Sequence, residues 1–260
     1  MSTASPAALL GKPASSGSSY WALSRAPRYS LTFALPLLVA YEALAALLGG
    51  AGGGGLRNGA DVWLKTPFVA LLGPHGPLAF GVVIVAIALA LVIRDLRRTR
   101  QPLRGDVFAG MLVESAVMAV VCGLAVGMAT ARLMQTLPGL VIAAEPIARL
   151  GVASKLMIAL GAGLYEELLF RVVLVSGLMW LAKRAIGLGP AASALMATVG
   201  GAIIFALAHH IGAYGEPLTA QAFTFRVLAG LFFSGLYVLR GFGITAWTHA
   251  LYDVMVLVIR

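Results

Sequence analysis

Charged residues are scarce in this sequence. Only 11% of its 260 residues are Asp, Glu, Lys or Arg, whereas an ordinary soluble domain has about 25%. So few charges could not cover the surface of a soluble fold, which excludes a soluble globular domain and a disordered chain. The formal net charge of +9 does not indicate nucleic-acid binding, because no compact basic domain exists to carry it.

Cysteine is nearly absent as well. Cys122 is the only one, so the chain can form neither an internal disulfide nor a cysteine-based zinc site. Residues 1–19 are rich in Ser, Ala, Pro and Gly and lack the apolar segment of a secretory signal peptide. We interpret residues 1–28 as a flexible N-terminal tail and residues 29–260 as a single transmembrane domain.

What the sequence does have is long apolar runs, with 60% hydrophobic residues and a mean hydropathy of +0.93. A transmembrane helix needs about 20 mostly apolar residues, and because lipid tolerates only helices or closed barrels, we predict an all-α, polytopic transmembrane helical bundle. The stretch 133–150 is either an interfacial segment or an eighth span, and Gly73-Pro74-His75-Gly76-Pro77 interrupts the start of the second span. The seven predicted spans are 30–49, 72–93, 107–130, 155–182, 187–208, 223–239 and 241–259.

The distribution of Lys and Arg predicts the orientation of the bundle. With a cytoplasmic N-terminus, eleven basic residues fall on the cytoplasmic side and six on the other, which agrees with the positive-inside rule. We therefore expect an integral protein of the inner (plasma) membrane of a bacterium, with its N-terminus in the cytoplasm. The eleven are Lys12, Arg25, Arg28, Arg94, Arg97, Arg98, Arg100, Arg104, Lys183, Arg184 and Arg240.

A few ionisable residues remain inside the predicted spans, where charge is costly and usually functional. Span 155–182 contains Glu166, Glu167 and Arg171. Glu167 and Arg171 share a helix face at i,i+4 and can pair, whereas Glu166 points elsewhere and could act as a general base. Glu42 and Glu114, in the first and third spans, match no motif, and we expect each to pack against or pair with another span.

Three of the four histidines lie in the fifth and seventh spans. The fifth ends in Phe205-Ala206-Leu207-Ala208-His209-His210, and the last contains His249 and Asp253 at i,i+4 spacing. At that spacing a carboxylate can orient the imidazole, or both can face one ligand. A single membrane histidine is more often a packing residue, but two spans that carry histidines near a Glu-Glu pair favour a chemical site.

These residues form three motifs, EExxxR (Glu166, Glu167, Arg171), FxxxH (Phe205, His209) and HxxxN/D (His249, Asp253), on separate predicted spans. In this order the motifs resemble the CAAX prenyl protease and bacteriocin-processing (CPBP, or Abi) family of intramembrane endopeptidases. The resemblance covers about 155–259, the protease-like core, and the first three spans match only in character.

The resemblance implies hydrolysis of a peptide bond in a membrane-associated protein or peptide. Glu166 would activate water, His209 would hold that water or polarise the scissile carbonyl, and His249 with Asp253 would stabilise the oxyanion. Glu167 and Arg171 would brace the site. Asp253 departs from the Asn of many relatives, and an ionised Asp cannot donate to an oxyanion. No cofactor is expected, although Zn²⁺ held by Glu166, His209 and His249 is the alternative, since two histidines and a carboxylate are a catalytic zinc pattern.

Another class of function remains open from the residues. The Glu/His cluster could be a proton relay in a transporter or a packing network in a membrane scaffold. Internal inverted repeats would favour a transporter, and we found none. For an endopeptidase, the partners are a membrane-tethered substrate and the lipid bilayer. The position of His209 at the non-cytoplasmic end of its span predicts a cavity that opens away from the cytoplasm and receives an exported peptide.

Overall fold

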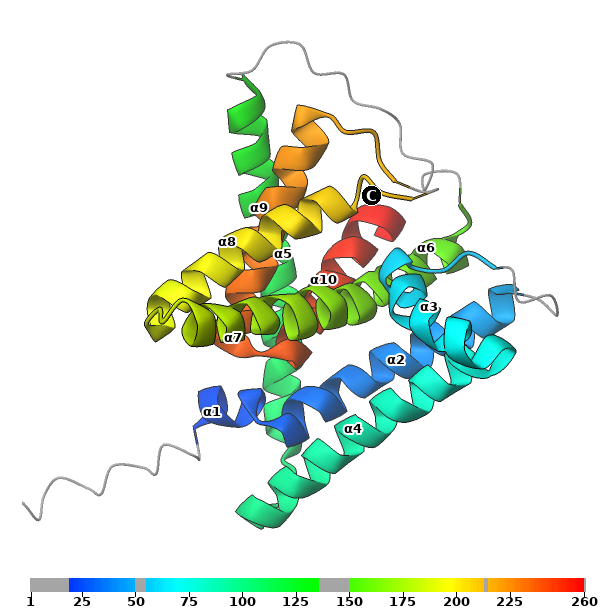
Figure 1. Ribbon diagram of the computed structural model, residues 1–260, viewed down its shortest axis with the longest axis vertical. Coiled ribbons are helices and arrows are strands. Elements are labelled where there is room, and N and C mark those ends of the chain that lie inside the picture. Colours follow the sequence, from blue (N-terminus) through cyan, green and yellow to red (C-terminus); the bar gives the residue numbers. More distant parts are fainter. Residues whose placement is uncertain (1–18, 50–54, 136–149, 213–214, 260) are drawn as a thin grey trace, which may run out of the picture.

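The computed structural model describes residues 19–49, 55–135, 150–212 and 215–259, and these residues form an all-helical bundle (Figure 1). The polytopic helical fold predicted from the sequence is therefore confirmed. In chain order the elements are α1 (Tyr20–Arg25), α2 (Pro27–Gly49), α3 (Gly59–Leu72), η2 (Gly73–His75), α4 (Gly76–Thr99), α5 (Gly105–Gln135), α6 (Val152–Gly161), η4 (Ala162–Glu166), η5 (Leu168–Val175), α7 (Ser176–Ala185), α8 (Pro190–Ala208), α9 (Ala220–Arg240), α10 (Phe242–Val254) and η6 (Met255–Ile259).

Six helices of the described residues are long and apolar enough to cross a membrane. The fourth predicted span, 155–182, is not among these six and lies within the helical run from α6 to α7, which carries Glu166, Glu167 and Arg171 near its middle. The possible eighth span falls largely on residues 136–149, which lie outside the described residues. The six helices are Pro27–Gly49, Gly59–Thr99, Gly105–Gln135, Pro190–Ala208, Ala220–Arg240 and Phe242–Ile259.

The predicted N-terminal tail is too long. Residues 1–18 lie outside the described residues, but Tyr20 already begins α1, and Arg28 is buried in the first turn of α2. No local sequence pattern predicts this helix, because the contacts that hold it in place are tertiary. The tyrosine hydroxyl of Tyr20 donates to Glu114 at 2.6 Å, and the guanidinium of Arg240 lies 3.7 Å from the ring of Trp21.

The predicted break before the second span is present as a reversal of the chain. Gly73 adopts φ +56°, and a Cβ at Gly76 would lie 2.4 Å from the backbone nitrogen of Val69, so glycine is needed for α3 to pack back on α4. With 14 residues, α3 is about 21 Å long, too short to cross a hydrocarbon core of about 30 Å. Its N-terminus points into the bundle instead.

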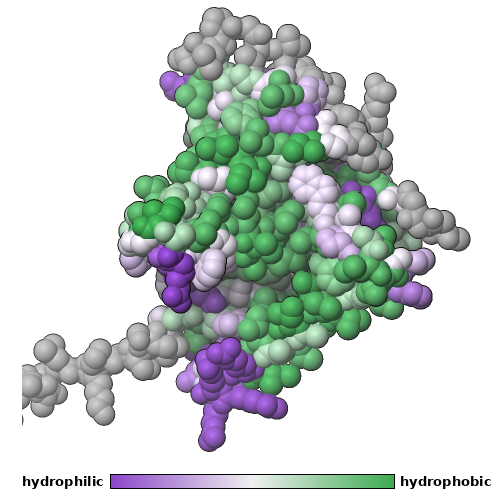
Figure 2. Space-filling view, viewed as in Figure 1, coloured by the Kyte–Doolittle hydropathy of each residue, from purple (hydrophilic) through white to green (hydrophobic). Residues whose placement is uncertain are grey.

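Polar contacts join several helix ends on one side of the bundle, at the lower left of Figure 1. Arg25 donates to the carbonyl of Val238 at 3.3 Å, and Arg28 pairs with Asp95 at 3.2 Å. This is the side for which the Lys and Arg count predicts the cytoplasm. Figure 2 shows hydrophilic residues gathered there at the end of α4, below an otherwise largely apolar face.

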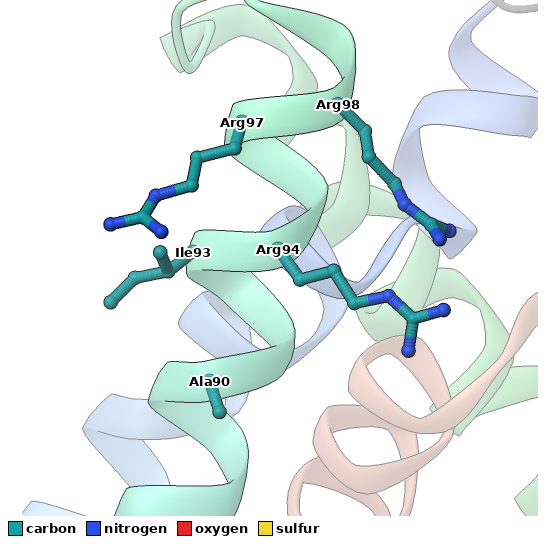
Figure 3. Close-up of a pocket in the computed structure, with 5 residues that line it drawn as sticks. All are labelled: Ala90, Ile93, Arg94, Arg97 and Arg98. Atoms are coloured by element: carbon teal, nitrogen blue, oxygen red, sulfur yellow. The ribbon is translucent and has the colours of Figure 1, made fainter.

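The end of α4 carries a shallow surface groove that contains no residue of the predicted site. Figure 3 shows Arg97 and Arg98 extending from one turn of the helix, Arg94 and Ile93 beside each other below them, and Ala90 lower still. A membrane-spanning helix that passes from aliphatic to arginine side chains is expected to leave the hydrocarbon core at this point. The groove is lined by Ala90, Ile93, Arg94, Arg97 and Arg98.

Candidate active site

The helical run that carries Glu166 and Glu167 changes its hydrogen-bonding pattern at these residues. Ala162–Glu166 and Leu168–Val175 are π-helical, and such wider turns often occur at functional sites. Gly163 lets α10 cross this segment closely, because a Cβ there would lie 2.4 Å from the carbonyl oxygen of Ala246. This close crossing brings His249, on α10, beside Glu167.

Glu167 is the structural member of the glutamate pair. Its side chain is fully buried, and Oε1 accepts a hydrogen bond from His249 Nδ1 at 2.7 Å. The predicted pair with Arg171 forms, with Nε 3.2 Å from Oε2. Arg171 is itself fully buried, with its guanidinium 4.4 Å from the ring centroid of Phe205 and 5.6 Å from that of Phe233. Both charges are therefore fixed by packing.

Glu166 has a different environment, as its helical position predicts. Its side chain is 13% exposed, and Oε2 lies 3.5 Å from His209 Nε2. The other oxygen, Oε1, accepts a hydrogen bond from Nδ2 of Asn58 at 2.9 Å. Of the two glutamates, Glu166 is the accessible one, and one of its oxygens faces a histidine rather than an arginine.

The FxxxH spacing has a direct structural explanation. His209 follows the last residue of α8, and its Nδ1 lies 2.8 Å from the carbonyl oxygen of Phe205, four residues earlier. A carbonyl can only accept, so Nδ1 carries the hydrogen, and in a neutral ring the Nε2 lone pair faces Glu166. The Phe205 ring packs edge-on against His209 at 4.4 Å between centroids.

His249 is held in the same manner. Its Nδ1 is bound by Glu167, and its ring stacks on Phe233 with centroids 4.2 Å apart. Its Nε2 lies 3.7 Å from Oδ2 of Asp253, too far for a normal hydrogen bond. Asp253 also lies within electrostatic range of Glu166 and His209. The structure thus places the predicted residues Glu166, His209, His249 and Asp253 in one neighbourhood of pairwise contacts and electrostatic interactions, with Glu167 bound to both His249 and Arg171.

His210 belongs to a different set of contacts, as the Phe205 spacing predicts. Its Nδ1 lies 2.9 Å from the backbone carbonyl of Glu216, whose own N–H donates to the carbonyl of His209 at 2.8 Å. Glu216 pairs with Arg226 on α9. Through Glu216, Arg226 links α9 to the backbone of His209, and it lies within electrostatic range of Glu166 and Asp253.

Both unassigned glutamates pair with other helices, as predicted. Glu42 accepts from Lys65 at 2.8 Å and from the Tyr165 hydroxyl at 2.5 Å, and Glu114 binds Arg240 at 2.5 Å.

The sequence did not lead us to predict Asn58 as a residue that contacts Glu166. The available signal was an N-cap pattern, in which an Asn after a glycine-rich loop precedes an apolar helix. Among the residues described, no group of three or more His, Cys, Asp or Glu has an arrangement that could hold a metal ion.

Comparison with known families finds one similarity, in the C-terminal part of the chain. Residues 149–255 match the family model described as type II CAAX prenyl endopeptidase Rce1-like. This match confirms the family predicted from the three motifs. The matched region contains all six predicted site residues. Among curated proteins and solved structures, none matches the chain. Six helices of the described residues are suited to cross a bilayer, and residues 149–255 are similar to a peptidase family, which together support an integral membrane protein with a peptidase-like region.

Proposed function

We propose that this protein is an intramembrane endopeptidase in which Glu166 is the general base that activates water. The observation that supports this most is that the two glutamates differ in burial and in hydrogen-bonding partners. Glu167 is fully buried and occupied by His249 and Arg171, whereas Glu166 is accessible and has Oε2 directed at His209 Nε2. A water between Glu166 and His209 could give its proton to the carboxylate while the ring accepts its second hydrogen.

His249 is then the donor that stabilises the tetrahedral oxyanion. Its Nδ1–H is already bound to Glu167, so donation requires a proton on Nε2 and hence an imidazolium ring. Two carboxylates favour that charged form, Glu167 at 2.7 Å and Asp253 at 3.7 Å. An Asp in place of the family's Asn therefore favours the charge on His249 instead of donating to the oxyanion, and the longer distance leaves the Nε2–H free for substrate.

The test of this proposal is a substrate trap. Glu166→Ala removes the base without adding bulk, so a bound peptide should persist through purification and be identified by mass spectrometry. We expect membrane peptides enriched on the trap over wild type, and cleaved in vitro only by wild type. If the trap captures nothing, and reconstituted protein instead shows pH-gradient-driven flux that Glu166→Gln blocks, the cluster is a proton relay and the peptidase assignment is wrong.

We also propose that hydrolysis proceeds without a metal. Prolonged treatment with a strong zinc chelator should then leave the cleavage rate unchanged within about twofold, and elemental analysis of active protein should find far less than one Zn²⁺ per chain. Loss of activity on chelation with recovery on stoichiometric Zn²⁺ would contradict this version. It would assign Glu166, His209 and His249 as ligands, because both histidines have Nδ1 bound by an acceptor, the usual arrangement of zinc-binding imidazoles.

We further propose that the cavity opens away from the cytoplasm, toward exported peptides tethered to the membrane. The support is that His209 and the segment after it lie at the opposite end of the bundle from the arginines of α4 (Figure 1). Single cysteines at Ile211, which is 64% exposed, and at Arg98 form a matched pair in a Cys122→Ala background. We expect an impermeant reagent to label position 211 in intact spheroplasts and position 98 only after lysis. The reverse result would invert the orientation.

A further inference from the structure

Asn58 is the N-cap of α3, and this role fixes the direction of its side-chain amide. The side chain is buried, and its Oδ1 accepts a hydrogen bond from the backbone N–H of Ala60 at 2.9 Å. An amide has its acceptor and its donors on opposite branches. With Oδ1 committed to the helix cap, the NH₂ group must point the other way, toward Glu166.

The contact with Glu166 selects one carboxylate oxygen. Nδ2 of Asn58 lies 2.9 Å from Oε1, while Oε2 faces His209 Nε2 at 3.5 Å. A carboxylate held at one oxygen cannot rotate freely, so the second oxygen keeps its direction. This is the kind of preorganisation that a general base requires, because proton abstraction depends on its reach to the water.

Asn58 is itself held from behind by an aromatic residue of α2. Its backbone N–H donates to the Tyr41 hydroxyl at 3.2 Å, and that hydroxyl donates to Asp61 at 2.8 Å. Gly161 makes the space for this arrangement. A Cβ there would lie 2.5 Å from the Tyr41 ring and 2.9 Å from the Cβ of Asn58. The approach of α3 to the catalytic helix thus depends on a residue without a side chain.

The charged residues around this contact pair with one another. Two acids, Glu42 and Asp61, pair with two bases, Arg57 and Lys65, at distances from 2.6 to 3.4 Å. Their formal charges cancel, so they place no net charge beside Glu166. They bind α3 to α2 and keep its N-terminus in place. The connection from this set to Glu166 runs through the amide of Asn58, which donates hydrogen bonds but does not relay protons.

We propose that Asn58 is a positioning residue that sets the orientation of the Glu166 carboxylate, and that α3 forms a support for the active site from outside the family-matched region. This inference rests on the proposed function of Glu166. It goes beyond the family match because residue 58 lies outside the matched residues 149–255. The part of the chain before the matched region would thereby contribute directly to the geometry of catalysis.

Two substitutions at position 58 separate positioning from folding. Ser and Asp cap helices about as well as Asn does, so α3 should still begin at Gly59. Asn58→Ser loses the donor to Glu166, and we expect kcat to fall about 10- to 100-fold, as for loss of a hydrogen bond to a charged group, with KM changed less than twofold. Asn58→Asp places a carboxylate against Glu166 and should lower kcat further. Ser19→Asn, at the cap of α1, is the matched control and should keep wild-type kcat.

The outcomes distinguish failure of this inference from failure of the proposed function. Wild-type kcat in either Asn58 variant, in a protein whose Glu166→Gln form is inactive, would overturn the positioning role. If Glu166→Gln cleaves normally, the proposed function fails, and a double-mutant cycle on unfolding then tests the contact without turnover. In that cycle Asn58→Ser removes the donor and Glu166→Ala removes the acceptor, so their effects should be non-additive, and additive effects would overturn the inference. If Asn58→Ser unfolds, the nearly isosteric Asn58→Asp provides the same measurement.

Discussion

Replacing Glu166 with glutamine is expected to lower the rate of peptide cleavage by about 10²- to 10⁴-fold, the contribution typical of a general base. Glutamine keeps the shape of the side chain and an oxygen that can accept from Asn58, but it cannot take a proton from water. Folding should be little affected, because Glu166 forms no close ion pair with a permanently charged residue. The measurement is kcat on a peptide identified with the substrate trap, in proteoliposomes, together with thermal unfolding.

Histidine variants provide the matched comparison for this result. His209 faces Glu166, whereas the neighbouring His210 binds the carbonyl of Glu216. We expect His209→Ala to lose most activity and His210→Ala to retain it within a few-fold, although both remove an imidazole from consecutive positions. If the two variants are equally impaired, the site geometry around Glu166 is wrong. If Glu166→Gln is active and Glu167→Gln is not, the roles of the two glutamates are reversed.

Replacing Arg171 with methionine is expected to destabilise the protein by about 3–5 kcal/mol, the cost of removing one partner of a buried ion pair. Glu167 would remain fully buried with only His249 as a counterpart. The contacts of the guanidinium with Phe205 and Phe233 would be lost at the same time. Unfolding in detergent, followed by circular dichroism during denaturant titration, measures this free-energy difference.

The double variant Glu167→Gln/Arg171→Met is the control for that stability effect. It removes both charges, and glutamine still offers an oxygen to His249 Nδ1. Because replacing both members of a buried pair is often close to neutral, we expect it to recover most of the lost stability. Arg97→Met, at the end of α4, should change stability by no more than about 0.5 kcal/mol. Equal stability of wild type and Arg171→Met would contradict a bracing role for the pair.

The motif residues could be placed from sequence because their spacing encodes local geometry. Glu167 meets Arg171 one turn later, Phe205 meets His209 one turn later, and the apolar length of each span fixes its helix. The ionisable groups within the apolar runs also indicated the candidate site residues, and the family resemblance selected the same ones. The two π-helical segments at 162–166 and 168–175 could not be predicted, because nothing in the sequence distinguishes their wider turns from those of an ordinary α-helix.

Contacts between helices that are far apart in the chain could not be predicted from the sequence. Asn58 and Glu166 are 108 residues apart, and the approach depends on Gly161, whose role is visible only once Tyr41 and Asn58 are beside it. The same reason explains the predicted tail, which includes the helix α1. Tyr20 and Trp21 are fixed by Glu114 and Arg240, more than 90 residues later, and no local pattern indicates that pairing.

The most direct test of the central claim is to carry out cleavage in water enriched in ¹⁸O. Wild-type protein in proteoliposomes is incubated with a membrane peptide that was identified with the Glu166→Ala trap. The mass of the fragment with the new carboxyl terminus is then measured by mass spectrometry. We expect one ¹⁸O atom in that terminus for wild type and no product above background for Glu166→Gln, because the Glu166 carboxylate activates the attacking water. Equal yields of labelled product from wild type and Glu166→Gln would contradict it.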